Sequence, residues 1–208
     1  MATGLGIREL VAALILALSA VSCRRSPVDV GVVFATSWKL GAESLNESEQ
    51  LRIKRNVLET LRRACAGFDV RFAEGASGTR LIRVEDTPYV SDPRQLVSFG
   101  AAGVTYPASR VSSVRVDVLL NAEIAAANCR DITHCTKTRI ELLDGFGKGI
   151  GATAAHELGH QAGFGFAIDS HCDDCYDGKT STSSNHFFGD KHWSDSAMRI
   201  MRRVLPPG

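Results

Sequence analysis

IGATAAHELGHQAG, at residues 150–163, is the stretch on which the interpretation of this chain depends. Its small residues predict a slim helix over 150–162 that ends before Gly163. His156 and His160 stand four residues apart, so a helix would project both rings from one face, with about 5–6 Å between their Cβ atoms. Glu157 follows the first histidine directly. The stretch therefore predicts a helix that presents two imidazoles and a carboxylate together.

Two imidazoles on one face of a helix can hold one Zn²⁺ ion. Zinc lowers the pKa of a bound water toward about 7, and Glu157 would accept the proton as that water attacks a polarised carbonyl. The chain holds six histidines, and His-Glu-x-x-His arises by chance in roughly one chain of such composition in a hundred. The motif predicts a zinc-dependent hydrolase with one catalytic ion bound by His156 and His160.

The run from His156 to Gly163 resembles the start of the extended signature His-Glu-x-x-His-x-x-Gly-x-x-His of the metzincin zinc peptidases. The resemblance implies a peptide or protein substrate. It also implies that Gly163 turns the chain out of the helix, so that a third ligand reaches the metal. The position that corresponds to this ligand is Phe166, which cannot bind zinc.

The third zinc ligand must therefore lie elsewhere. Residues 171–175, His-Cys-Asp-Asp-Cys, are similar to the His-Cys…Cys run that follows the glycine in archaemetzincins. This similarity implies His171 as the third ligand, after a five-residue insertion. No glutamate occurs after Glu157, which excludes a downstream glutamate ligand. The next candidate is Asp169, followed by either His186 or His192.

The hydrophobic pattern around the motif predicts a sheet. Strands are expected at 28–34, 68–73, 81–84 and 111–120. The last of these alternates apolar and polar residues. By the metzincin resemblance it would be an edge strand that lines the cleft and pairs with an extended substrate. The alternative interpretation, an ordinary core strand, is equally supported by the sequence. The range 87–107 is expected to be a loop.

Two further helices are expected on either side of the motif. The first covers 46–66, and its inner stripe is Leu51, Leu58, Leu61 and Cys65. The last is capped by Ser194, and its inward residues are Ala197, Ile200, Met201 and Val204. Met198 and Met201 follow this helical pattern and are expected in the core rather than in a methionine turn beneath the metal. The elements predict an α+β, zincin-like domain: a twisted sheet, an active-site helix and a small irregular C-terminal subdomain that ends in a helix.

The N-terminus predicts export. Arg8 precedes an apolar run at 10–21, which is too short for a comfortable membrane span but suits a secretory signal peptide. We expect a signal peptide at 1–22, an N-terminal subdomain at 23–163 and a C-terminal subdomain at 164–208. Cys23 follows the expected cleavage site, in a stretch similar to a bacterial lipobox, so the mature protein is expected to be secreted or attached to the cell envelope through a lipid on Cys23.

Six cysteines in an exported chain suggest disulfides. Cys129 and Cys135 bracket a short polar loop, and Cys172 and Cys175 form a second close pair. Cys65 reads as a small buried hydrophobe. If Cys23 is not lipidated, it could form a third bridge with Cys65, and the sequence leaves both possibilities open.

Charge and composition narrow the function classes. With 24 Lys and Arg against 23 Asp and Glu, the net charge of +1 gives no electrostatic argument for nucleic acid as a partner. Two alternatives to a peptidase remain: a catalytically silent zincin-fold binding module at the cell envelope, and a redox protein built around Cys172 and Cys175. The intact Glu157 argues against the first, and the Gly- and Asp-rich surroundings of the cysteine pair argue against the second.

Overall fold

The computed structural model describes residues 26–35, 38–40, 43–85, 102–105, 109–130, 134–165, 172–178 and 183–208. In chain order the elements are β1 (Val28–Phe34), β2 (Lys39–Leu40), β3 (Glu43–Ser44), α2 (Glu47–Ala64), β4 (Val70–Glu74), β5 (Arg80–Glu85), β6 (Gly103–Thr105), β7 (Val111–Arg115), α3 (Val116–Ala126), α4 (Arg139–Gln161), α5 (Ser184–Phe188) and α6 (Asp195–Val204). The expected signal peptide and Cys23 lie outside the described residues.

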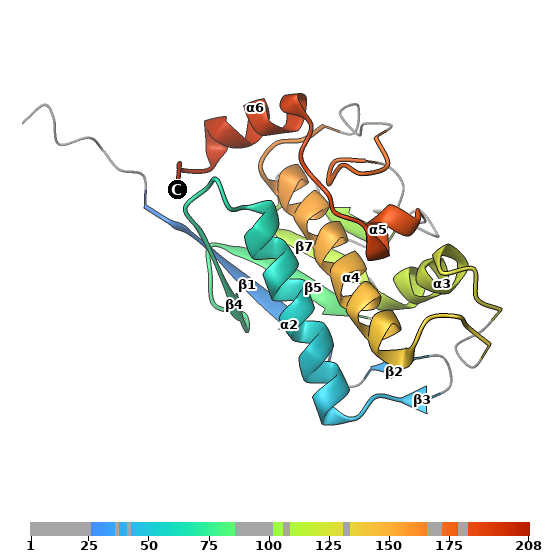
Figure 1. Cartoon of the computed structure of the whole chain (residues 1–208). Coiled ribbons are helices and arrows are strands. Elements are labelled where there is room, and N and C mark those ends of the chain that lie inside the picture. The colour runs from blue at the N-terminus through green and yellow to red at the C-terminus, as the bar shows by residue number, and fades with distance from the viewer. Residues whose placement is uncertain are drawn as a thin grey trace, which may run out of the picture.

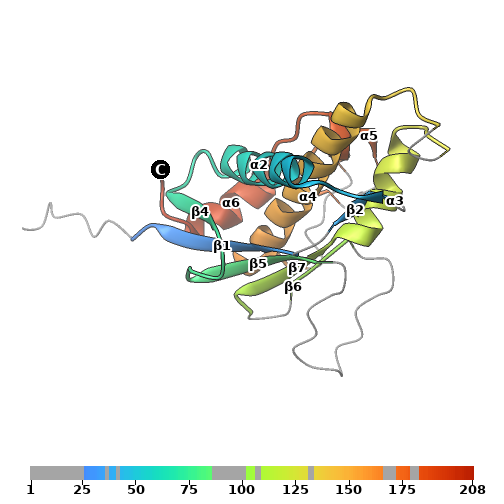
Figure 2. The same ribbon diagram turned by 90° about the horizontal axis from the view of Figure 1, so that it is seen from below.

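The chain has a mixed α/β fold built on a five-stranded, mostly parallel sheet, which is compatible with the predicted α+β class. The strand order is β4-β1-β5-β7-β6. Four strands run parallel, and β6 pairs antiparallel with β7 at one edge. Helices α2, α4 and α6 lie on one side of the sheet, with α4 crossing over its centre (Figures 1 and 2). This arrangement places α4 against the face of the sheet, in one layer with α2 and α6.

Helices α2 and α4 pack closely because glycine removes side chains from their interface. A Cβ at Gly147 would lie 2.6 Å from Cβ of Asn56, and one at Gly151 would lie 2.6 Å from Cβ of Thr60. These glycines also explain why α4 begins eleven residues before the expected position, 150: glycine has low helix propensity, and here packing overrides it. The helix begins with a capping box in which Thr138 and Glu141 bond each other's backbone N–H.

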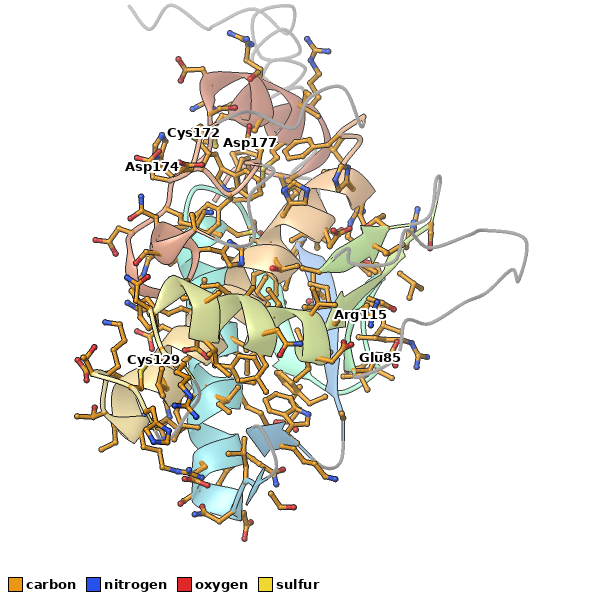
Figure 3. All side chains as sticks on the ribbon, turned by 90° about the vertical axis from the view of Figure 1, so that its right-hand side faces the viewer. Glu85, Arg115, Cys129, Cys172, Asp174 and Asp177 are labelled. Carbon is orange, nitrogen blue, oxygen red and sulfur yellow. A yellow bond between two sulfur atoms is a disulfide. The ribbon has the colours of Figure 1, made fainter. Side chains whose placement is uncertain are left out.

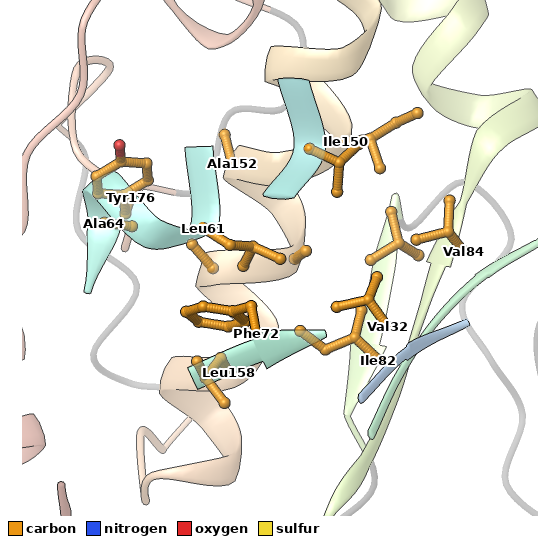
Figure 4. Packing of buried hydrophobic residues seen from close by; sticks show 14 of the residues in the cluster. Val32, Leu61, Ala64, Phe72, Ile82, Val84, Ile150, Ala152, Leu158 and Tyr176 are labelled. Atoms are coloured by element: carbon orange, nitrogen blue, oxygen red, sulfur yellow. The ribbon is translucent and has the colours of Figure 1, made fainter. Parts of the chain in front are cut away.

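The core lies between the helical layer and the sheet (Figure 4). Leu61 of α2 and Leu158 of α4 are fully buried there, as are Val32 and Ile82 of the sheet. The predicted inner stripe of α2 was partly wrong, because Leu51 is 51% exposed. The residues of α2 that are buried are Ile53, Val57, Thr60, Leu61 and Ala64. Both stripes have helical spacing and share Leu61, so spacing alone cannot choose between them.

The predicted strand at 111–120 is wrong in its second half. The strand β7 ends at Arg115, and α3 begins at Val116. Val116 and Leu119 are three residues apart and both buried, which is helical rather than strand spacing. The edge of the sheet is formed instead by β6, within the range that was expected to be a loop. Three residues with no clear alternation give too little pattern to predict a strand.

The cap and most of the inward residues predicted for the C-terminal helix are confirmed. The Ser194 side chain accepts a hydrogen bond from the N–H of Ala197 and caps α6. Ala197 and Met201 are fully buried in the core, and Met198 packs against it. Val204, which was expected to face inward, is 40% exposed.

The cysteines lie as the sequence predicts. Cys129 and Cys135 are at disulfide distance, and so are Cys172 and Cys175. Cys65 is buried, and burial raises the pKa of its thiol to about 12. The two pairs fit an oxidising, exported environment. None of the described helices is both long and apolar enough to cross a membrane.

One buried carboxyl group makes stability depend on pH. Glu123 of α3 is fully buried, and neither of its carboxyl oxygens has a hydrogen-bond partner among the described residues. Burial raises the pKa of Glu123 from 4.5 to about 9, although the backbone of Phe146 and the Lys137 ammonium partly offset this effect. Between these two pH values the folded protein keeps a proton that the unfolded chain releases.

We therefore expect the free energy of unfolding to fall as pH rises from about 5 to 9, with a contribution from Glu123 of up to about 1.4 kcal/mol per pH unit. The Glu123→Gln variant, which keeps the shape without the proton, should lack this contribution. Urea unfolding at a series of pH values measures it, with the exposed Glu59→Gln as the control. Equal pH slopes for the wild type and Glu123→Gln would contradict the assignment.

Candidate metal centre

Two imidazoles and a carboxylate converge near the C-terminal end of α4. Nε2 of His156 and Nε2 of His160 are 3.0 Å apart. One carboxylate oxygen of Glu157 joins them, so that the three donor atoms lie within 4.8 Å of one another. The helix thus brings together the three side chains that the sequence motif singled out.

Backbone carbonyls fix the orientation of both rings. Nδ1 of His156 lies 2.9 Å from the carbonyl oxygen of Tyr176, and Nδ1 of His160 lies 3.2 Å from that of Phe164. A carbonyl oxygen can only accept, so in both hydrogen bonds Nδ1 carries the proton. In a neutral ring, Nε2 is then left with a lone pair and no proton. Each Nε2 is therefore prepared to donate electrons to a metal.

The distance between the two Nε2 atoms fits a shared cation. Two lone pairs 3.0 Å apart repel each other, and an ion or proton between them removes the repulsion. Two nitrogens bound to one tetrahedral zinc ion at about 2.0–2.1 Å would lie ~3.3 Å apart. His156 and His160 need to separate by only a few tenths of an ångström to reach that geometry, so they can hold a metal ion.

The turn after α4 supplies the partner of His160. Gly163 has φ +107°, a left-handed conformation that glycine adopts readily. The N–H of Gly163 bonds the carbonyl of His160, and the N–H of Phe164 bonds that of Gly159, which together form a Schellman motif. This turn brings the Phe164 carbonyl back to His160. The sequence prediction that Gly163 turns the chain out of the helix is confirmed.

The partner of His156 belongs to a second segment, 172–178, which is tied to the start of α6. The N–H of Tyr176 bonds the carbonyl of His192 at 2.7 Å. Asp177 is buried, and its carboxylate accepts hydrogen bonds from the backbone N–H and the hydroxyl of Ser194 at 3.0 and 2.6 Å. Figure 3 shows Asp177 close to α6. These bonds hold the Tyr176 carbonyl against His156.

Glu157 is buried between α4 and the edge strand. Only 5% of its surface is exposed. The hydroxyl of Thr105 donates to Oε2 of Glu157 at 2.5 Å. A Cβ at Gly103, two residues earlier on the same face of β6, would overlap the carboxylate. Neither Gly103 nor Thr105 was predicted to belong to the site, because no spacing in the sequence connects them with Glu157.

Of the candidate third ligands, His171 and Asp169 lie outside the described residues, as does Phe166. His186 is buried beside α4, where its Nε2 lies 3.0 Å from both Thr153 Oγ1 and the carbonyl oxygen of Gly149. Its Nδ1 faces the ammonium of Lys191 at 3.4 Å. Burial lowers the pKa of His186 to about 3, so its ring is neutral. Both its ring nitrogens are engaged away from the centre.

His192, the last candidate, belongs to a different group. Its Nε2 lies 3.6 Å from Sγ of Cys175. Together with Cys172 and Asp174 (labelled in Figure 3) these residues form a second set whose donor atoms lie within 4.8 Å of one another. In the structure Cys172 and Cys175 are at disulfide distance. The sequence pointed to the cysteine pair, but nothing in it connected His192 with that pair 17 residues earlier.

In comparisons with known proteins, no family model, curated protein or solved structure matches the chain.

The turn that orients His160 leads to a testable prediction. A Cβ at Gly159 would overlap the Phe164 ring, so Gly159→Ala should displace Phe164 and its carbonyl. We expect a loss of about 1–3 kcal/mol in the free energy of unfolding, despite the higher helix propensity of alanine, and a roughly tenfold loss in metal affinity.

Urea unfolding and competition with a zinc-binding dye measure the two effects. Gly165→Ala is the matched control, because a Cβ there would meet no atom of the described residues within 4 Å. The assignment fails if Gly159→Ala binds zinc as tightly as Gly165→Ala does.

Proposed function

We propose that this protein is a zinc-dependent peptidase of metzincin-like type. The proposal rests above all on one observation: two Nε2 atoms face each other at 3.0 Å while both Nδ1 atoms are held by carbonyls. Histidines without a shared ligand are not expected to adopt this arrangement. It favours a metal ion, because each imidazole directs an Nε2 lone pair toward one point.

Zinc suits this donor set, because catalytic zinc sites often combine two imidazoles with a third protein ligand and keep a fourth position open for water. When bound, zinc lowers the pKa of a water toward about 7 and polarises a substrate carbonyl. His156 and His160 hold the ion. Glu157 accepts the proton of the attacking water on a carboxylate oxygen and passes it to the leaving amine.

The edge strand β6 supports a peptide as the substrate. It ends the sheet, and no other described strand pairs with its outer side. An extended peptide can add to such an edge by main-chain hydrogen bonds. Thr105 on this strand touches Glu157, so a peptide on β6 would pass beside the proposed base. The role that the sequence assigned to the 111–120 strand therefore passes to β6.

We infer that the third ligand comes from the segment between Gly165 and Cys172, with His171 as the first choice and Asp169 as the second. Two contacts support this inference. The chain leaves the centre at Phe164, whose carbonyl meets His160, and returns to it at Tyr176, whose carbonyl meets His156. The described residues on either side of the segment therefore contact the two histidines.

The third ligand can be identified by metal analysis. We expect purified protein to hold one zinc ion at the histidine pair. His171→Ala should lower the zinc affinity by at least about tenfold, and the exposed His134→Ala should leave it unchanged. If the affinity survives His171→Ala but falls with Asp169→Ala, the ligand is Asp169. Unchanged affinity in both variants would show that neither residue is a ligand. The analysis is done with oxidised protein, so that Cys172 and Cys175 cannot bind zinc as thiolates.

The role of Glu157 separates a peptidase from a silent binding module. Glu157→Gln should keep the zinc content of the wild type and lose at least about 100-fold in kcat/KM on a mixture of quenched fluorogenic peptides. Glu59→Gln, a change of an exposed glutamate, serves as the control. Peptide binding without cleavage by the zinc-loaded wild type would favour the binding module instead.

A further inference from the structure

Four polar side chains form a ring between the end of α4 and the edge of the sheet. Glu157 and Gln161 are four residues apart on α4 and therefore project from one face of that helix. Thr105 of β6 and Ser112 of β7 are opposite each other in the antiparallel ladder. Nε2 of Gln161 donates to Ser112 Oγ at 2.7 Å. The two hydroxyl oxygens are 2.6 Å apart, and Thr105 Oγ1 donates to Glu157 Oε2 at 2.5 Å.

The direction of these hydrogen bonds is fixed at one end by Leu81. The Gln161 amide nitrogen lies 3.1 Å from the Leu81 carbonyl oxygen, which can only accept, so this side of the amide must be the NH₂ group. Its second proton goes to Ser112 Oγ. The Ser112 hydroxyl is then free to donate to Thr105, and Thr105 donates its own proton to Glu157. Each hydroxyl accepts once and donates once.

We propose that Thr105, Ser112 and Gln161 are positioning residues that hold the Glu157 carboxylate in the orientation needed to receive a proton. The inference rests on the proposed function and extends it to residues that touch neither substrate nor metal. Donors in such a chain polarise one another, so the bond that reaches Oε2 is stronger than an isolated hydroxyl contact. Thr105 Oγ1 also lies 3.1 Å from the backbone carbonyl oxygen of Glu157, but its single proton is already donated to Oε2, so the strand holds Glu157 through its carboxylate.

Burial restricts the inner part of the ring. Ser112 is fully buried and Glu157 is 5% exposed, whereas Thr105 and Gln161 are half-buried. Water therefore has little room beside Ser112 and the carboxylate. The strand leaves no alternative position on one side, because a Cβ at Gly103 would already overlap the carboxylate. Removing one hydroxyl should therefore let the carboxylate turn without unfolding the site.

The test compares three variants of the full-length, zinc-loaded protein. Thr105→Val removes the hydroxyl and keeps the shape of the side chain, Thr105→Ser restores the hydroxyl, and Ser112→Ala breaks the ring one step earlier. We measure kcat and KM on a quenched fluorogenic peptide that the wild type cleaves, together with zinc content. Thr105→Val should lose roughly 10- to 100-fold in kcat with little change in KM or zinc content.

Rescue distinguishes positioning from general damage. Thr105→Ser should regain kcat to within about threefold of the wild type, and Ser112→Ala should show a smaller loss than Thr105→Val. The proposal is overturned if Thr105→Val keeps full kcat, or if Thr105→Ser is as slow as Thr105→Val. A rise in KM or a loss of zinc in place of a fall in kcat also overturns it.

A second measurement separates this proposal from the proposed function. The free energies of unfolding of Thr105→Val, Glu157→Ala, which removes the acceptor, and the double variant form a double-mutant cycle that needs no activity. If the ring exists, the double variant should be less destabilised than the sum of the single variants. Additive losses would show that Thr105 does not hold Glu157. Absence of peptidase activity together with a coupled cycle would remove the proposed function and leave the ring in place.

Discussion

Burial of α4 is the constraint on which the rest of the structure depends. This helix crosses the sheet in the middle of the molecule, and glycines at 147 and 151 let α2 approach it to a distance that any larger residue would prevent. Because the helix is packed on several sides, its last two turns cannot rotate. His156, Glu157 and His160 therefore point in fixed directions, and the carbonyls and hydroxyl that they meet come from three other parts of the chain.

Residues close in sequence were predictable, because their spacing alone sets their geometry. The motif at 156–160 and the turn at Gly163 depend on contacts within a few residues, and the strand at 28–34 was recognisable from its apolar pattern although its partners lie far along the chain. Helical spacing places His156 and His160 on one face whatever surrounds them. The same holds for Cys129 and Cys135, whose loop is too short to keep them far apart.

The start of α4, the partners of Glu157 and Gln161, and the edge strand β6 depend on tertiary packing and could not be predicted from the sequence. The glycines of α4 argue locally against a helix at 145–151, and packing against α2, α3 and α5 stabilises one there. Thr105 lies 52 residues before Glu157, and Ser112 and Leu81 meet Gln161 across 49 and 80 residues. No periodic pattern in a single chain carries such pairings. The edge strand was missed for a related reason, since β6 has three residues and gains its order from β7.

The position of Thr105 has a consequence for how a ligand and the proposed base influence each other. The backbone of β6 faces an open side of the sheet, while a side chain of the same strand grips Glu157. Any peptide that straightens this strand must also change the freedom of the carboxylate, and by thermodynamic reciprocity a change at Glu157 must alter the affinity of the strand for the peptide. In the proposed peptidase, the affinity for the peptide and the orientation of the Glu157 carboxylate would then depend on one equilibrium.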